Sequence, residues 1–162
     1  MPHLRRGFDA GIEVPKGGYD LAVALKDTGD LPGAALIIRR ITPPDGSDAE
    51  GFLRLGRLAS QVRAPEAAEP FFRRAVQLRP AQASARQQLG LNLLVLGRFE
   101  EAASELREAA RLEPGDPDSL AHLAYCEARL GRAADARVHA GAALALDPNH
   151  ALAKQLTAVL GR

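Results

Sequence analysis

Small and apolar residues recur along this chain with a period of 34 residues. Each unit has a leucine followed by a small residue, an alanine twelve residues later, a second alanine seven residues after the first, and a proline five residues after the second. The three sets are Leu55-Gly56 with Ala68, Ala75 and Pro80; Leu89-Gly90 with Ala102, Ala109 and Pro114; and Leu123-Ala124 with Ala136, Ala143 and Pro148. Three copies in one register indicate that the chain is built by repetition.

The spacing within a unit predicts a pair of antiparallel helices. A small residue beside a leucine lets two helices approach closely, and alanines seven residues apart keep the second helix thin on the side that faces the first. The proline that closes each unit cannot donate a hydrogen bond to the preceding turn, so it ends the second helix. Gly97 and Gly131 lie between the two helices of their units, where a left-handed residue commonly ends the first helix.

Particular residues mark where helices begin or are disturbed. Asp116 followed by Pro117 predicts an N-cap and a first helical residue. The segment Ser47-Asp48-Ala49-Glu50 has the form of a capping box. Pro70 lies inside the helix that Pro65 is expected to open, and because an interior proline costs about 3 kcal/mol, we expect a local kink there.

The register extends beyond the three full units. One period earlier, Leu21-Ala22, Gly29, Ala34, Ile38 and Ile41 fall on matching positions and predict a degenerate fourth hairpin. Pro43-Pro44 is expected to cut its second helix short, and Asp45-Gly46-Ser47 to lengthen the connection. After Pro148, residues 149–160 supply one helix with Leu152, Leu156, Val159 and Leu160 on one stripe, which is expected to cap the last hairpin.

The predicted organisation is a short extension followed by one repeat domain. Residues 1–14 form the N-terminal extension, which we expect to be poorly ordered. Residues 15–162 form the domain, with a degenerate repeat at 15–48, full repeats at 49–82, 83–116 and 117–150, and a capping helix at 151–162.

These units resemble the tetratricopeptide repeat, whose pattern W-x2-L-G-x2-Y, A-x3-F and P has a period of 34. The first aromatic is Phe52 in one unit but Arg86 and Leu120 in the others, and the usual tyrosine is replaced by Ala59, Leu93 and Glu127. The resemblance implies an all-α fold, a right-handed α-solenoid of stacked antiparallel helix hairpins. It also implies a non-catalytic scaffold that binds other proteins.

Composition argues against several other classes of protein. The net charge is +1, with 21 basic and 20 acidic residues, so no strong field favours nucleic acid or an anionic membrane. Cys126 is the only cysteine, so no disulfide can form within the chain. No apolar run approaches the roughly 20 residues of a membrane span, and Asp9 and Glu13 interrupt the apolar stretch that an export signal after Arg5-Arg6 would need. We therefore expect a cytoplasmic protein, although a truncated chain that had lost a signal or anchor would show the same sequence.

Candidate catalytic and metal-binding residues are few. His122 and Cys126 are four residues apart on one predicted helix, with Glu127 adjacent and His139 in the next helix. Zinc needs three or four such ligands. The favoured interpretation is a partly buried histidine and a packed thiol. No nucleophile, base and orienting group are assembled in the sequence, so we predict no enzymatic activity and no cofactor.

Function is expected on the concave face that stacked hairpins create, which the first helices line. The residues opposite the leucine contacts are the predicted partner-binding set: Tyr19, Val23, Lys26, Leu53, Arg57, Gln61, Gln87, Leu91, Leu94, Val95, Asp118, Tyr125 and Arg129. The apolar members Leu53, Leu91, Leu94, Val95 and Tyr125 are expected to form a contiguous patch, rimmed by Lys26, Arg57 and Arg129. Alternatively, neighbouring helices cover Leu91, Leu94 and Val95.

Two functions remain open at this point. The first is binding of a peptide or helix of another protein in the groove. Asp118 would repel a carboxylate, so the acidic tail of a chaperone is a disfavoured partner. The alternative is a structural protein that assembles with itself into homo-oligomers, as rings or filaments.

Overall fold

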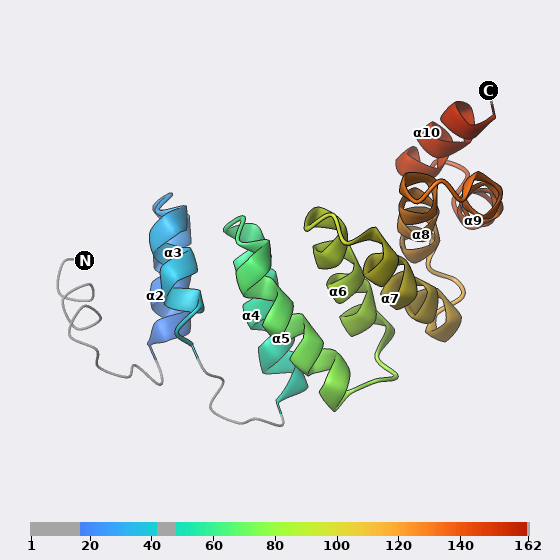
Figure 1. Ribbon diagram of the computed structural model, residues 1–162. Coiled ribbons are helices and arrows are strands. Elements are labelled where there is room, and N and C mark those ends of the chain that lie inside the picture. The colour runs from blue at the N-terminus through green and yellow to red at the C-terminus, as the bar shows by residue number, and fades with distance from the viewer. Residues whose placement is uncertain (1–16, 42–47, 162) are drawn as a thin grey trace. The chain divides into compact units, whose positions relative to one another are not determined.

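The computed structural model describes residues 17–41 and 48–161, and every regular element in them is an α-helix (Figure 1). The helices are α2 (Gly18–Asp27), α3 (Leu31–Ile38), α4 (Ala49–Gln61), α5 (Pro65–Leu78), α6 (Ala83–Val95), α7 (Phe99–Leu112), α8 (Pro117–Arg129), α9 (Ala133–Leu146) and α10 (Ala151–Leu160). The predicted all-α repeat fold is confirmed. Residues 1–14, Pro43-Pro44 and Asp45-Gly46-Ser47 lie outside the described residues.

The chain divides into two compact units, unit 1 (Met1–Leu78) and unit 2 (Arg79–Arg162). Unit 1 contains the hairpins α2–α3 and α4–α5, and unit 2 contains α6–α7, α8–α9 and the additional helix α10. Each helix pair falls where the 34-residue period places it. A single domain over residues 15–162 and a right-handed superhelix both stay predictions.

Close approach inside each hairpin depends on the small residue after the leucine. A Cβ atom added to Gly56 would lie 2.5 Å from Cε1 of Phe72, and one added to Gly90 would lie 2.7 Å from Cγ of Leu106. Ala124 fills the same place in the third repeat and packs with Ala140. The larger the facing side chain, the smaller the residue that fits beside the leucine.

Three of the four turns within hairpins use glycine in the left-handed region. The φ angles are 84° at Gly29, 75° at Gly97 and 75° at Gly131, as predicted for the last two. The turn between α4 and α5 instead places Arg63 at a φ of 58°. Arg63 lies one period before Gly97, so it occupies the glycine position without being glycine.

Helix starts follow the predictions in part. The Asp116 side chain caps α8 by accepting hydrogen bonds from the backbone N–H groups of Asp118 and Ser119, each at 3.1 Å, which confirms the predicted N-cap. The capping-box prediction is wrong at its first position, because the N-cap of α4 is Asp48, which accepts from the Gly51 N–H at 2.8 Å. Ser47 itself lies outside the described residues.

Proline inside α5 does not end the helix. The helix runs from Pro65 to Leu78 through Pro70, whose ring is exposed. Pro70 has no N–H to donate to the carbonyl one turn earlier. The kink expected there stays a prediction.

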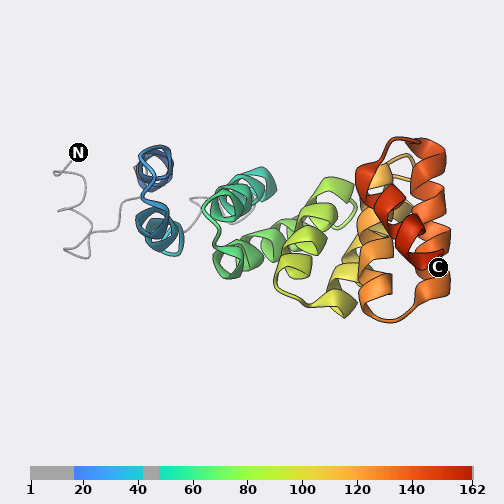
Figure 2. The same cartoon turned by 90° about the horizontal axis from the view of Figure 1, so that it is seen from above.

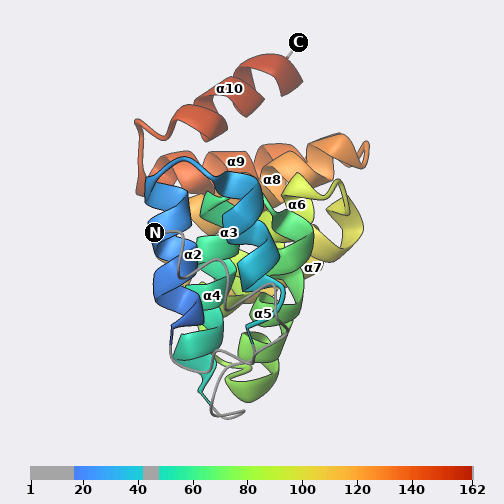
Figure 3. The ribbon, with the colours of Figure 1, turned by 90° about the vertical axis from the view of Figure 1, so that its left-hand side faces the viewer.

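Helix α10 lies against α8 and α9 at the end of unit 2 (Figure 2, Figure 3). Leu156 is buried with Ala124 and Ala140, and Leu152 and Leu160 pack beside them. Ala153 is also fully buried, so the apolar stripe is centred between Leu156 and Ala153. Val159 therefore points away from the buried stripe, and its side chain is 66% exposed. Its predicted place on the stripe is wrong.

Candidate partner-binding face

Helices α6 and α8 are the first helices of the two hairpins in unit 2, and they contact each other. The predicted residues Gln87, Leu91, Leu94 and Val95 follow one another along one side of α6. Leu91 and Leu94 are half-buried, so their neighbours cover them only in part. Val95 is 69% exposed and is therefore not covered by neighbouring helices. We refer to Leu91, Leu94 and Val95 as the apolar row.

Two predicted residues of α8 are held in position by an aromatic ring from α7. The Tyr125 ring meets the Phe99 ring edge-on, with centroids 6.5 Å apart. The Arg129 guanidinium lies 4.4 Å from the centre of the Phe99 ring, and its Nη1 donates to the Tyr125 hydroxyl at 2.9 Å. Because cation–π contacts and hydrogen bonds both restrain Arg129, its charge has a defined place on this face.

Phe99 was missed by the sequence criterion, which considered only first helices. It opens α7, two residues after the left-handed Gly97. Its position at the start of α7 would have identified Phe99, because the first residue of the second helix in a hairpin lies close to the end of the first helix.

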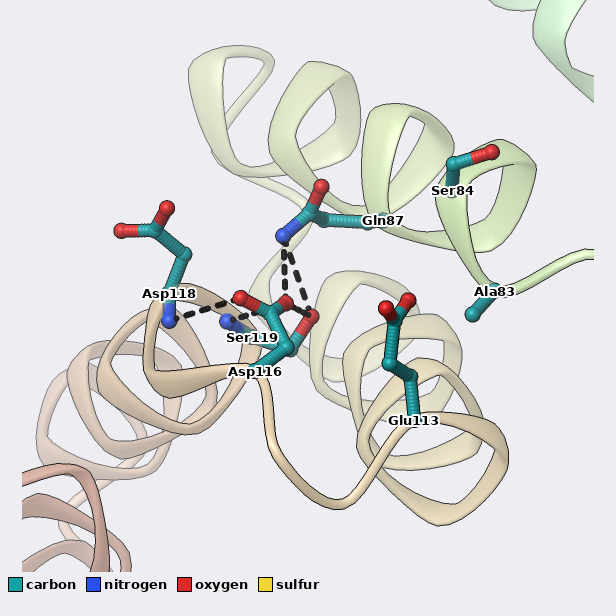
Figure 4. Close-up of a pocket in the computed structure, with 7 residues that line it drawn as sticks. All are labelled: Ala83, Ser84, Gln87, Glu113, Asp116, Asp118 and Ser119. Carbon is teal, nitrogen blue, oxygen red and sulfur yellow. Dashed lines mark hydrogen bonds between the residues drawn. The ribbon is translucent and has the colours of Figure 1, made fainter. Parts of the chain in front are cut away.

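A polar hollow of about 230 Å³ lies beside the N-terminal ends of α6 and α8 (Figure 4). Its lining residues are Ala83, Ser84, Gln87, Glu113, Asp116, Asp118 and Ser119, and we call it the acidic pocket. Three of these residues are acidic and none is basic. Ser84 and Gln87 belong to the same side of α6 as the apolar row, so the pocket and the row share one face.

Gln87 lies on this face and also links α6 to α8. Its Nε2 donates to Oδ2 of Asp116 at 2.7 Å and to the Ser119 hydroxyl at 3.2 Å, which ties α6 to the start of α8. The same Asp116 carboxylate caps α8. In Figure 4 the Gln87 amide oxygen points away from Asp116, so only the oxygen side of this amide is presented to a partner.

Asp118 has a histidine partner from the start of α10. His150 Nε2 lies 2.9 Å from Oδ1 of Asp118, and His150 Nδ1 accepts from the Ala153 N–H at 3.3 Å to cap α10. With Nδ1 accepting at the start of α10, Nε2 is the ring nitrogen that donates to Asp118. The Asp118 carboxylate is 64% exposed at the pocket, so a partner can reach it.

The predicted residues of unit 1 divide into exposed and buried ones. Tyr19, Arg57 and Gln61 are exposed, and Val23 and Lys26 are half-buried. The Lys26 ammonium pairs with Asp27 at 2.8 Å, and the Arg57 guanidinium lies 3.7 Å from the Glu50 carboxylate.

Leu53 is fully buried, and its predicted place on an open face is wrong. The reason is that α4 packs against α5 and also contacts α3, so more than one side of the helix is covered. The predicted contiguous patch therefore loses its Leu53 end. The remaining members, Leu91, Leu94, Val95 and Tyr125, all belong to unit 2.

The side chains considered for metal binding have other roles. Nδ1 of His122 donates to the Asp118 carbonyl at 2.7 Å. Glu127 is only 1% exposed and pairs with His139 at 2.6 Å and with Arg107 at 3.2 Å. Burial, and then the Glu127 carboxylate, raise the pKa of the Cys126 thiol to about 11. Within residues 17–41 and 48–161, no three His, Cys, Asp or Glu side chains are arranged to hold a metal ion.

Among the described residues, no helix combines the length and the apolar character that crossing a bilayer requires.

Sequence comparison identifies the repeats. A family model described as a tetratricopeptide repeat matches residues 49–82, and a second model with the same description matches residues 93–160. Together they cover more than half of the chain. No curated protein matches the chain in sequence.

Several solved structures share the fold. MamA aligns with a TM-score of 0.75 at 20% identity, over 88% of this chain and 78% of its own. YrrB, described as a TPR protein with an unusual peptide-binding site, aligns with a TM-score of 0.64 at 20% identity, over 95% of this chain and 97% of its own. The second TPR domain of human RPAP3, in complex with an HSP70 peptide, aligns with a TM-score of 0.67 at 18% identity, over 70% of this chain and 95% of its own. Identities this low show a common fold alone.

Proposed function

The chain belongs to the tetratricopeptide repeat family, and on that premise we propose that it is a non-catalytic scaffold that binds a peptide or helix of another protein on the α6–α8 face of unit 2. The observation that carries the proposal is the apolar row, whose last member, Val95, is 69% exposed on α6, and α6 contacts the helix α8 that holds Tyr125 and Arg129. Exposed apolar surface rimmed by polar groups is typical of a protein-binding site. Peptides bound to RPAP3, and the peptide-binding site ascribed to YrrB, support the same kind of ligand.

Pre-ordering of the face favours binding. Tyr125 and Arg129 are already held by Phe99, so a partner does not have to immobilise them. The exposed and half-buried members of the predicted set in unit 1 stay part of the proposal as a second contact region for larger partners: Tyr19, Val23, Lys26, Arg57 and Gln61.

Affinity capture from the source cell tests the proposal. The wild-type chain, the Val95→Glu variant and the Val159→Glu variant serve as baits. Val159 is the matched control because it is an exposed valine at 66%, on α10 rather than α6. We expect Val95→Glu to lose the partner that the wild type and Val159→Glu retain. Equal recovery by all three baits would contradict the proposed face.

A second candidate function, self-association, is favoured by the outer side of α9. At the four positions of this side, α7 carries Glu100, Ser104, Arg107 and Arg111, whereas α9 carries Ala134, Val138, Gly141 and Ala145. All four α9 residues are exposed, and nothing lies within 4 Å of a Cβ built on Gly141. An apolar helix face of small residues allows a second copy to approach closely.

Sedimentation velocity over a range of concentrations tests self-association. The wild-type chain should form oligomers as the concentration rises, and the Val138→Glu variant should stay monomeric. A wild-type chain that is monomeric at high concentration would exclude this role.

A further inference from the structure

We infer that the partner segment is extended and carries a lysine or arginine about four residues from a large apolar side chain. The cation lies against Glu113 and Asp118, and the apolar side chain lies on Leu94 and Val95. This inference rests on the proposed function, because it names the class of partner for the same face.

Negative charge gathers at one end of the face. Glu113 follows the last residue of α7, where the helix C-terminus already carries partial negative charge. Its side chain is exposed, and no ion pair with it is found among the described residues. Asp118 adds an exposed carboxylate to the same pocket.

No basic residue is among those that line the pocket. Asp116 is largely satisfied by the amides at the start of α8 and by Gln87. Among the described residues, Asp118 has one side-chain partner, the His150 ring, and its carboxylate is 64% exposed and open to a further ligand. With no basic residue lining the pocket, a cation from outside the chain is the complementary ligand.

The opposite end of the face has the opposite sign. Arg129 lies at the last residue of α8, fixed over Phe99 and bonded to Tyr125. A basic side chain of a partner is repelled there and attracted at the pocket. Charge complementarity therefore sets the direction in which a segment lies on the face.

The length of the face sets the spacing within the partner. Ser84 lines the acidic pocket, and Leu94 lies ten residues further along the same helix. A helical rise of 1.5 Å per residue places them about 15 Å apart. An extended segment advances about 3.3 Å per residue, so this distance corresponds to about four to five residues. Because alternate side chains point to opposite sides, a spacing of about four residues places both side chains on the face.

Selection from a displayed library of random peptides of about ten residues, long enough to span the face, tests the inference with the full chain as bait. We expect the recovered peptides to be enriched in lysine or arginine about four residues from a large apolar residue, and their binding to be lost in Val95→Glu. A recovered peptide should bind the Glu113→Gln/Asp118→Asn double variant about fivefold more weakly at low salt, the size expected when two exposed ion pairs are removed. Added salt should weaken wild-type binding toward the level of that variant.

The matched control is Glu66→Gln/Asp135→Asn, which removes two exposed carboxylates elsewhere and should leave the affinity unchanged. Asn at position 118 can still accept from His150, so the neutralised variant keeps that contact. Peptides that depend on Val95 but show no basic enrichment, or no loss on neutralisation, overturn this inference and leave the proposed function standing. Recovery of no peptide that depends on Val95 overturns the proposed function itself.

Discussion

Arg63 adopts a backbone conformation that glycine adopts in the other three hairpin turns. Its φ of 58° lies in the left-handed region, where a side chain costs about 1–2 kcal/mol. Gly97 holds the equivalent position one period later, and a Cβ there would meet nothing within 4 Å. The cost at this position is therefore conformational rather than a matter of packing.

A reciprocal exchange tests this cost. Arg63→Gly should raise the free energy of unfolding by about 0.5–1 kcal/mol, since relief of strain exceeds the extra freedom of glycine in the unfolded chain. Gly97→Ala should lower it by a similar amount. Urea titrations followed by circular dichroism measure both changes. A loss of stability in Arg63→Gly would show that contacts of the arginine stem outweigh the backbone strain.

Cys126 gives a second prediction at the residue scale, in the pH dependence of stability. Its thiol pKa is raised from 9.0 to about 11, first by burial and then by Glu127, so the folded state keeps a proton that the unfolded chain has released. A raised folded pKa gives stability that is present below the unfolded pKa and is lost as the pH rises. The free energy of unfolding should fall between about pH 9 and pH 11, and it should fall less in Cys126→Ala. Parallel curves for the two proteins from urea titrations across this range would contradict the raised pKa.

At the scale of helices, the hairpins could be predicted from the sequence because the residues on their contact faces recur in every repeat. The leucine, the small residue and the alanines define which sides of two helices meet, and Gly56 and Gly90 show how little space is left there. The outward sides were harder to predict. Leu53 lies opposite the leucine contact but is covered by another neighbour, and Phe99 contributes from a second helix. Exposure depends on elements distant in sequence, which a single helical period does not contain.

Substitutions in α10 test whether its buried contact with α8 and α9 stabilises unit 2. Leu156→Ala removes a buried side chain from the cluster with Ala124 and Ala140, and should lower the free energy of unfolding of unit 2 by about 2 kcal/mol. Val159→Ala in the same helix removes an exposed side chain and should change it by less than about 0.5 kcal/mol. Thermal unfolding and limited proteolysis measure the difference. Equal effects of the two substitutions would mean that α10 does not stabilise unit 2 through this contact.

At the scale of the molecule, the nearly balanced charge conceals a local asymmetry. With 21 basic and 20 acidic residues, the composition does not predict an acidic pocket at one end of the face. The asymmetry arises because Glu113 and Asp118 come together across the α7–α8 connection while nearby arginines pair elsewhere, such as Arg86 with Glu105 at 2.8 Å. Local pairing, which composition does not record, leaves the pocket acidic.

The division into two compact units predicts that unit 2 suffices for a short ligand. The apolar row, the acidic pocket, Tyr125 and Arg129 all lie between residues 79 and 162, as do the buried clusters beneath α10. Stability in repeat proteins comes mainly from neighbouring repeats, so a fragment of residues 79–162 should keep its helices.

The fragment should bind a peptide selected on the full chain with a dissociation constant within about threefold of the full-length value, a difference of less than about 0.7 kcal/mol. Circular dichroism of the fragment checks its folding, and fluorescence anisotropy with the labelled peptide checks its binding. A folded fragment that has lost the peptide would assign the site to unit 1, where Tyr19, Arg57 and Gln61 are exposed. A fragment that is itself unfolded would show that unit 2 depends on unit 1 for its stability, contrary to the prediction.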